Sequence, residues 1–235
     1  MHKAPEPVRR WTWPHYYISV YLTGIWMRIM GGFVVRGRQY LPRKGGAVVC
    51  ANHVSYLDPP VLGGAILPRR TYFMAKIELF KIPGFSLFIR KHYAFPVDRN
   101  NADREAIRFG IELLQKGELL VVFPEGGRSP DGSLQRGNFG PALMASKAGV
   151  PIIPAAIKET NKVMPPKGGL HRGRVQVDFG EPIDPKEFGG TRLGREPLGQ
   201  LTERLMSSIY ELQKQQHERV GEVAPPRTKE PVDAE

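Results

Sequence analysis

The chain has 235 residues, of which 41% are hydrophobic and 24% are charged. This is the composition of a globular protein with one substantial core, and it excludes wholesale disorder and a polytopic membrane protein. The 34 Lys and Arg residues outnumber the 23 Asp and Glu residues and give a formal net charge of +11, which favours polyanionic partners such as nucleic acid, phosphorylated substrates or anionic lipid.

The first 35 residues are rich in basic side chains and in tyrosine and tryptophan, whose rings settle at the depth of lipid headgroups. These rings belong to Trp11, Trp13, Trp26, Tyr16, Tyr17 and Tyr21. The stretch 16–35 matches the ~20 residues that span a bilayer, but Arg28, Gly31 and Gly32 interrupt it. We expect residues 1–35 to form a helical segment that lies on the membrane, with a first helix packed on the protein's own core as the alternative. Because no secretory cleavage pattern follows, we expect a peripheral or monotopic protein at the cytoplasmic face of the cell membrane.

A short apolar run at residues 47–51 follows two glycines and predicts a buried strand that leads into Asn52 and His53. Active sites of α/β proteins lie where strands end in this way. The single cysteine, Cys50, lies within the run, so no intramolecular disulfide can form, and we expect it to be a small buried side chain.

The elements that follow alternate between helix and strand. In chain order we expect a helix within 55–67, strands at 71–75 and 94–97, a helix from Asn100 or Asn101 to Gln115, a strand at 119–123, a helix at 139–148, strands at 151–157 and 175–179, and a last amphipathic helix that carries Leu198, Leu201, Leu205, Ile209 and Leu212. This alternation predicts a single α/β domain over residues 36–219. Residues 220–235 are rich in Pro and charge, so we expect a disordered tail there.

Asp58 follows His53 by five residues, across the predicted turn from strand to helix. An imidazole titrates near neutrality and can take a proton from an attacking hydroxyl, while a carboxylate bonded to its other nitrogen fixes the tautomer and stabilises the charged ring. The two residues therefore predict a general base with its carboxylate partner. A capping Asp beside a surface His is the alternative.

A second cluster, Phe-Pro-Glu-Gly-Gly-Arg-Ser at residues 123–129, leaves a predicted buried strand. Its glycines let backbone N–H groups approach an anion closely, and Arg128 can hold two phosphate oxygens at once. The cluster predicts a phosphate-binding loop, with a turn that carries an exposed arginine as the alternative.

Two further segments also follow or form predicted strands. In Phe-Pro-Val-Asp-Arg at residues 95–99, Arg99 is placed either to hold phosphate or to pair with Asp98. Val-Pro-Ile-Ile-Pro at residues 150–154 carries no reactive side chain, so core packing is its default interpretation.

In this order the four segments resemble the signature blocks of the glycerolipid acyltransferase family, which includes the 1-acylglycerol-3-phosphate acyltransferases. That family's blocks read Asn-His-x-x-x-x-Asp, a block that ends in Asp-Arg, Phe-Pro-Glu-Gly-Thr-Arg-Ser, and Val-Pro-Ile-Ile-Pro. The similarity extends from about Arg36 to Pro182 and includes a lysine-containing segment at 76–80. One departure is Gly127, which stands where the family usually has Thr, so a hydroxyl that would contact the acceptor phosphate or brace the loop is missing. The resemblance implies one glycerol-3-phosphate-acyltransferase-like domain with a central mixed sheet flanked by helices.

The activity that the resemblance implies is transfer of a fatty acyl group from acyl-CoA or acyl carrier protein to the free sn-2 hydroxyl of 1-acylglycerol 3-phosphate, giving phosphatidic acid in phospholipid synthesis. It implies that His53 and Asp58 are catalytic. The implied acceptor-binding residues are Asn52, Lys76, Arg99, Glu125, Gly126, Gly127, Arg128 and Ser129. We expect no metal ion and no cofactor beyond the acyl donor. The expected partners are the lysophospholipid acceptor, the donor and a membrane surface, without nucleic acid.

Other functions fit the residues less well. A serine hydrolase needs a Gly-x-Ser-x-Gly elbow, and the segment 84–88 lacks the closing glycine. A non-catalytic lipid-binding protein would use the same aromatic segment and positive charge, but His53 and Asp58 together argue against it. Nucleic-acid binding has the charge but no recognisable module. Within the enzyme class, glycerol 3-phosphate, another lysophospholipid and a lyso-ornithine lipid stay open as acceptors.

Overall fold

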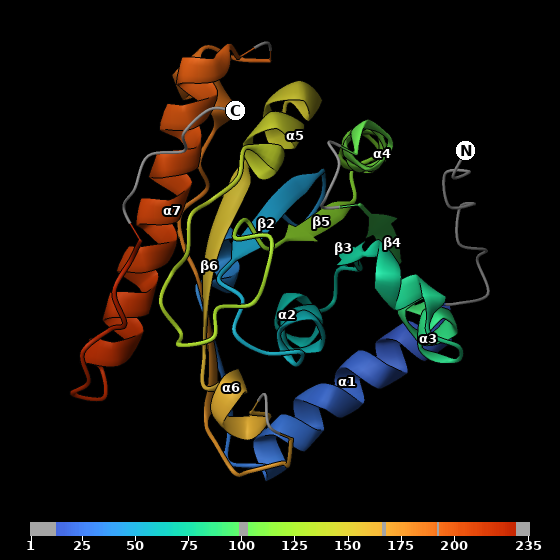
Figure 1. Ribbon diagram of the computed structural model, residues 1–235, viewed down its shortest axis with the longest axis vertical. Helices are drawn as coiled ribbons and strands as arrows, with labels where there is room; N and C mark the ends of the chain where they lie inside the picture. Colours follow the sequence, from blue (N-terminus) through green and yellow to red (C-terminus); the bar gives the residue numbers. More distant parts are fainter. Residues whose placement is uncertain (1–12, 99–102, 166–167, 192, 229–235) are drawn as a thin grey trace.

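The computed structural model describes residues 13–98, 103–165, 168–191 and 193–228 (Figure 1). Within them one sheet contains β1 (Phe33–Arg36), β2 (Ala47–Ala51), β3 (Thr71–Lys76), β4 (Ala94–Val97), β5 (Leu119–Val122), β6 (Ile152–Lys158) and β7 (Val175–Phe179). The α-helices are α1 (Trp13–Ile29), α2 (Asp58–Ile66), α3 (Phe85–Lys91), α4 (Arg104–Gln115), α5 (Gly140–Ala148), α6 (Thr160–Val163) and α7 (Arg195–Glu218). Short 3-10 helices are η2 (Arg38–Tyr40), η3 (Ile77–Lys81) and η4 (Pro185–Phe188).

The sheet has the strand order β1-β7-β6-β2-β5-β3-β4, and all neighbouring strands are parallel except β6 and β7. This confirms the predicted α/β fold with a central mixed sheet. In the centre, β2 pairs with β5 so that Cys50 lies opposite Val122. If the same register continues beyond the strands, His53 is level with Glu125. The carboxyl ends of these parallel strands meet at one edge of the sheet, where sites of α/β proteins form.

Two helical layers cover the sheet, with α4, α5 and α7 on one face and α1 and α2 on the other (Figure 1). Successive residues of β2 point to opposite faces, as the pleat requires. Val49 packs in the core beneath α1 and α2, whereas Val48 and Cys50 pack beneath α4, α5 and α7. Cys50 is fully buried, as predicted, and burial raises the pKa of its thiol.

Residues 33–35, the end of the predicted membrane segment, lie in the sheet instead. Gly31 and Gly32 follow α1 with φ values of 137° and 131°, a region that favours glycine. A Cβ on Gly31 would lie 2.7 Å from the carbonyl oxygen of Gly173, so the close approach of these two backbones also requires glycine. The chain then enters β1, which pairs with β7. The predicted boundary at residue 35 is therefore too late, because a glycine pair and not the end of the apolar run ends the helix.

Helix α1 has a buried face and an exposed apolar face. Tyr16, Val20 and Met27 are buried, and the Tyr16 hydroxyl lies 2.9 Å from the hydroxyl of Thr71. The exposed apolar side chains are Ile18, Tyr21, Leu22, Ile25 and Ile29. One face thus packs on the domain, which is the alternative considered for this helix, and the other face offers apolar surface. Across the described ranges, no helix has both the length and the hydropathy to cross a membrane.

Helix α4 begins at Arg104, later than the sequence predicts. Its N-cap is Asp103, whose Oδ1 accepts the backbone N–H of Ala106 at 2.9 Å. Asn100 and Asn101, where the sequence predicts the start of this helix, lie outside the described residues. Asp103 takes the capping position instead, since its short carboxylate reaches the N–H groups of the first turn.

Residues 220–228, which the sequence assigns to a disordered tail, pair with the loop after β5. Leu134 donates its N–H to the carbonyl of Pro226 at 3.1 Å, and Thr228 donates its N–H to the carbonyl of Leu134 at 3.0 Å. The predicted start of the tail is therefore wrong as far as Thr228. Composition reveals only that few apolar side chains are present, whereas backbone hydrogen bonds order this part of the chain.

Candidate active site

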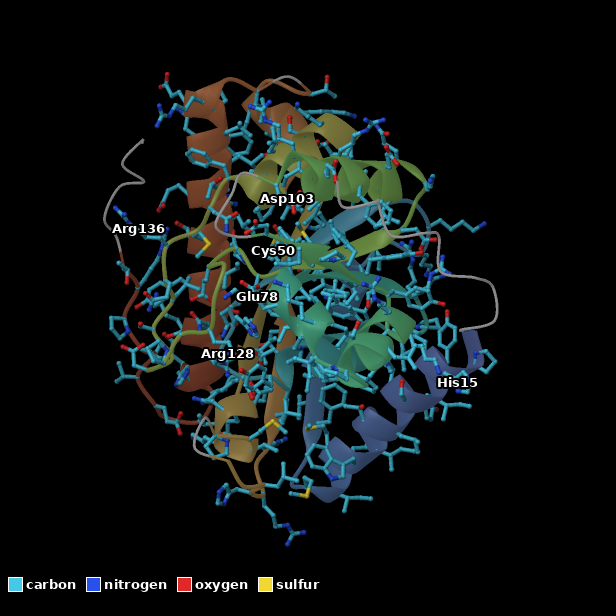
Figure 2. All side chains as sticks on the ribbon, turned by 45° about the vertical axis from the view of Figure 1, so that its right-hand side comes forward. His15, Cys50, Glu78, Asp103, Arg128 and Arg136 are labelled. Atoms are coloured by element: carbon cyan, nitrogen blue, oxygen red, sulfur yellow. The ribbon has the colours of Figure 1, made fainter. Side chains whose placement is uncertain are left out.

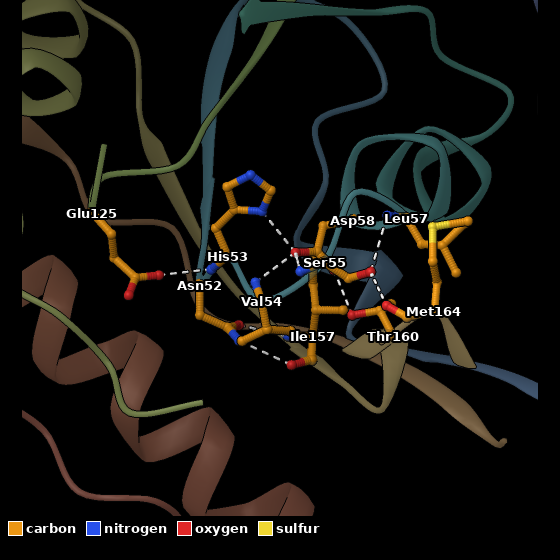
Figure 3. A network of polar contacts seen from close by, with 10 residues as sticks. All are labelled: Asn52, His53, Val54, Ser55, Leu57, Asp58, Glu125, Ile157, Thr160 and Met164. Atoms are coloured by element: carbon orange, nitrogen blue, oxygen red, sulfur yellow. Dashed lines mark hydrogen bonds and ion pairs between the residues drawn. The ribbon is translucent and has the colours of Figure 1, made fainter. Parts of the chain in front are cut away.

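Two loops meet at the carboxyl edge of the sheet, residues 52–57 after β2 and residues 123–129 after β5. The N–H of His53 donates to Oε1 of Glu125 at 2.7 Å (Figure 3). The N–H of Ser129 donates to the carbonyl of His53, also at 2.7 Å. The second loop therefore holds the backbone of His53 on both sides.

The imidazole of His53 is bonded to a buried carboxylate, at the spacing that the sequence predicts (Figure 3). Nδ1 lies 2.7 Å from Oδ2 of Asp58, whose side chain is fully buried, while the His53 side chain is 11% exposed. The same Oδ2 accepts the N–H groups of Val54 and Ser55 at 2.7 and 2.8 Å. Oδ1 accepts the hydroxyl of Thr160 at 2.5 Å. An ionised carboxylate can only accept, so it keeps a proton on Nδ1 and leaves Nε2 as the basic nitrogen.

The surroundings of this pair hold the ring and favour the carboxylate charge. The His53 ring stacks on Phe123 with centroids 4.0 Å apart and planes 17° apart. Asp58 is the first residue of α2, where backbone N–H groups and the helix dipole stabilise negative charge. The ring therefore has little freedom to turn away from the carboxylate.

Glu125 binds backbone N–H groups with both carboxylate oxygens. Besides the bond to His53, its Oε2 accepts the N–H of Gln135 at 2.8 Å. Burial raises the pKa of Glu125 to about 7, the two N–H bonds act in the opposite direction, and the charge of Asp58 adds to the effect of burial. The sequence predicts that Glu125 contacts the acceptor, but here its oxygens brace the loop that carries His53.

Asn52 and Ser129, two further predicted acceptor contacts, point into the protein. The Asn52 amide donates to the carbonyl of Ile157 at 3.0 Å and accepts its N–H at 2.8 Å, which extends the pairing of β2 with β6. The Ser129 hydroxyl donates to Oδ1 of Asp131 at 3.0 Å. Both side chains are buried, so they support the loops that form the site and do not face a substrate.

Arg128 is an exposed cation on the loop after β5 (Figure 2). Its guanidinium carbon lies 3.6 Å from the ring centroid of Tyr56, and Nη2 donates to the Tyr56 hydroxyl at 2.9 Å. Such stacking orients a guanidinium while leaving donors at its edge. No carboxylate in the described part of the chain pairs with Arg128, so an anionic ligand can use those donors.

Lys76 ends β3 at the same edge of the sheet. Because Phe73 lies opposite Val121, the continued register places Lys76 level with Pro124. Its side chain is 46% exposed, and Nζ lies 3.4 Å from Oε1 of Glu78. An ion pair this exposed is weak, so it does not prevent Lys76 from binding a phosphate.

The glycines of the second loop differ in what they require. Gly126 has φ of 71°, the left-handed region where a side chain is strained. A Cβ on Gly127 would meet nothing within 4 Å, so the absence of the family's threonine is not imposed by lack of space. Arg99, the remaining predicted contact, lies outside the described residues.

Three contributors to this site were missing from the sequence prediction. Thr160 carries no local signal, since 102 residues separate it from Asp58. Gln135 takes part through its backbone N–H, which any residue except proline supplies. Tyr56 lies inside the first block, and its aromatic side chain beside a predicted catalytic histidine was the available signal.

The arrangement joins one oriented base to exposed cations at the same sheet edge. It can take a proton from a hydroxyl group and bind an anionic substrate. Over the ranges that the structure covers, no group of three or more His, Cys, Asp or Glu side chains could hold a metal ion.

Comparison with known proteins gives consistent matches. A family model described as Acyltransferase matches residues 32–158. The 1-acyl-sn-glycerol-3-phosphate acyltransferase of Bacillus subtilis (strain 168) is 34% identical over 188 residues, which cover 80% of this chain and 91% of that protein. The enzyme of the same name from Escherichia coli (strain K12) is 31% identical over 179 residues, covering 74% of this chain and 71% of that protein. The crystal structure of the 1-acyl-sn-glycerophosphate (LPA) acyltransferase PlsC from Thermotoga maritima has a TM-score of 0.66 and 29% identity, covering 87% of this chain and 84% of that one.

Proposed function

This chain belongs to the acyltransferase family, and on that basis we propose that it transfers a fatty acyl group from a thioester to the free sn-2 hydroxyl of 1-acylglycerol 3-phosphate, giving phosphatidic acid. One observation carries the proposal: His53 is bonded through Nδ1 to the buried carboxylate of Asp58, beside the loop that carries Arg128. A base and a phosphate-binding cation on adjacent loops are what an acyl transfer to a phosphorylated alcohol requires.

The chemical step follows from the two nitrogens of His53. Nε2 takes the proton of the acceptor hydroxyl as the hydroxyl oxygen bonds to the thioester carbonyl carbon. Asp58 stabilises the imidazolium that forms. The tetrahedral intermediate then expels the sulfur, the C–S bond breaks, and the imidazolium returns its proton to the thiolate. No acyl-enzyme is formed, and nothing besides the two substrates is consumed.

Arg128 is the residue we assign to the acceptor phosphate. Its stacking on Tyr56 fixes the guanidinium plane, which suits a bidentate contact with phosphate oxygens. Lys76 supplies a second cation at this edge. The donor is acyl-CoA or acyl carrier protein, whose phosphates suit a net charge of +11, and no further cofactor is proposed.

The membrane surface is the proposed location of the reaction, at the cytoplasmic face of the cell membrane. The exposed apolar face of α1 lies beside a second exposed apolar segment, residues 82–88 after β3. A contact joins the two, because Oγ of Ser19 on α1 lies 2.6 Å from Nε2 of His92, the residue after α3. Exposed apolar side chains of that segment are Ile82, Phe85, Leu87 and Phe88. Lys81, Arg90 and Lys91 accompany them and suit anionic headgroups. Together the two elements form a peripheral membrane-binding surface.

The test is thiol release from palmitoyl-CoA by the purified protein in detergent, with and without 1-acylglycerol 3-phosphate, for wild type and His53→Ala. We expect release that needs the acceptor and that falls by about 100-fold or more in the variant, the scale of a lost general base. Near-normal turnover of His53→Ala would remove the mechanism. Release without acceptor would indicate a thioesterase, and absence of release with every thioester donor would favour a non-catalytic lipid-binding protein.

A further inference from the structure

The carboxylate of Asp58 has one oxygen held by its own loop and the other held from a distant part of the chain. Oδ2 accepts from His53, Val54 and Ser55, whereas Oδ1 accepts the Thr160 hydroxyl at 2.5 Å. Resting on the proposed function, we propose that Thr160 is a positioning residue, which sets the plane of the Asp58 carboxylate and thereby the direction of the His53 base.

The carboxylate of Asp58 could rotate if only its Oδ2 were held. Three donors converge on Oδ2, and these contacts alone allow the group to turn about Oδ2 and move Oδ1. In the described residues, the Thr160 hydroxyl is the donor that reaches Oδ1. Asp58 and Thr160 are both 0% exposed, so a solvent water molecule cannot take the place of the Thr160 hydroxyl as the donor to Oδ1. A buried carboxylate oxygen left without a donor is unfavourable, and the group would turn to find another.

The backbone before Thr160 adopts a conformation that places this hydroxyl. Glu159 has φ of 71° and ψ of 0°, a left-handed conformation that is unusual for a residue with a side chain. Its own side chain holds the turn, because Oε2 accepts the N–H of Arg174 at 3.0 Å and Oε1 lies 3.2 Å from Nζ of Lys162. Strained backbone of this kind persists where the surrounding structure fixes it, and it is concentrated near functional sites.

A second bond joins α6 to the loop that carries the base. The Ser55 hydroxyl donates to the carbonyl of Met164 at 3.2 Å, and Met164 in turn donates its N–H to the carbonyl of Thr160. The turn after β6 is therefore fastened to the His53–Asp58 loop at two points (Figure 3). Of these two contacts, only the one from Thr160 reaches the carboxylate.

Substitutions at Thr160 can separate the hydroxyl from the packing of the side chain. Thr160→Val keeps the branched shape and removes the hydroxyl, and Thr160→Ser keeps the hydroxyl and removes the methyl group. We expect Thr160→Val to lower kcat by about 10- to 100-fold, the scale of a lost hydrogen bond to a charged group, with both KM values within about twofold, since the residue touches no substrate. Thr160→Ser should recover kcat to within about threefold of wild type.

The acyl-transfer assay with palmitoyl-CoA and 1-acylglycerol 3-phosphate is run on wild type, the two Thr160 variants and His53→Ala, with thermal unfolding of each. If Thr160→Val does not fold, Thr160→Ala, which adds no bulk, is compared with Thr160→Ser instead. An inactive His53→Ala beside a Thr160→Val variant within twofold of wild type would overturn the role of Thr160 alone. Equal loss in the Val and Ser variants would assign the effect to packing and also overturn it. An active His53→Ala would overturn the proposed mechanism and this inference with it.

Discussion

The carboxyl group of Glu125 makes the stability of this protein depend on pH. In the folded chain the pKa of Glu125 is raised from 4.5 to about 7, and burial of the carboxyl group is the main cause. Between these values the folded protein retains a proton on Glu125 that the unfolded chain has released. Stability therefore falls as the pH rises through this window, which is the sign expected for a carboxyl whose folded pKa is raised.

The magnitude follows from the width of the window. One group that is protonated only in the folded state changes the free energy of unfolding by about 1.4 kcal/mol for each pH unit, so the whole window corresponds to about 3 kcal/mol. Glu125→Gln removes this titration and keeps the shape. The amide of the variant also presents N–H donors where a carboxylate oxygen accepted a backbone N–H, which lowers stability by an amount that does not depend on pH.

Urea unfolding followed by circular dichroism at 222 nm, in steps from pH 4 to pH 8, measures this effect. The unfolding free energy of wild type minus that of Glu125→Gln should fall by about 3 kcal/mol across the range. Titrations common to both proteins cancel in this difference. A difference that stays constant would mean that Glu125 titrates alike in the folded and unfolded chains, and would refute the claim that burial raises the pKa of Glu125.

Further predictions concern binding and membrane attachment. Arg128→Ala should raise the acceptor KM by about 10- to 100-fold, the scale of a lost charge-assisted contact, and leave the donor KM within twofold; equal effects on both would contradict the phosphate role. Gly127→Thr should fold, and its free energy of unfolding should exceed that of wild type by about 0.4–1 kcal/mol, because the side chain restricts the unfolded chain at a position with open space. Thermal unfolding at a lower temperature than wild type would instead show that the threonine strains the loop. In vesicle flotation, Leu22→Asp with Phe88→Asp should release the protein from anionic vesicles, whereas Val223→Asp, at an apolar residue of the C-terminal segment that is 93% exposed, should not; retention of the double variant would place the attachment elsewhere.

Substitutions on the exposed face of α1 test membrane binding better than deletion of the N-terminal segment, because the other face of α1 is part of the core. Tyr16 and Met27 are buried on its inner face, and the Tyr16 hydroxyl contacts Thr71 on β3. Deleting residues 1–30 would remove these contacts and unfold part of the domain. Substituting Leu22 changes only the outer face.

The strands were predictable where local pattern decides them. The bounds of β2, β4 and β7 agree with the predicted runs at 47–51, 94–97 and 175–179, since short apolar segments between turns have few alternatives. Neither β1 nor α3 was predicted. β1 lies within a longer apolar run whose periodicity does not separate helix from strand, and α3 has only seven residues directly after Pro83 and Gly84.

The site was predictable where its contacts are local in sequence. Asp58 reaches His53 across five residues, so the block already indicates the pair. The contacts of Glu125 and Thr160 span 72 and 102 residues, and depend on which strands become neighbours. A single sequence can indicate that a polar residue follows a strand. Whether that residue faces a substrate or a backbone N–H group depends on the order of the strands in the sheet, which the sequence alone does not give.

Contacts hold the backbone, one ring face and Nδ1 of His53, and leave Nε2, the nitrogen that we propose as the base. Glu125 holds its N–H, Ser129 holds its carbonyl, Phe123 covers one ring face, and Asp58 holds Nδ1. These constraints come from two adjacent parallel strands and the loops that follow them, so the sheet fixes the proposed base before any substrate binds. Preorganisation of this kind lowers the barrier of the chemical step without adding contacts to the substrate. Substitutions among these supports should therefore lower kcat, whereas substitutions of the exposed cations at the sheet edge should raise KM.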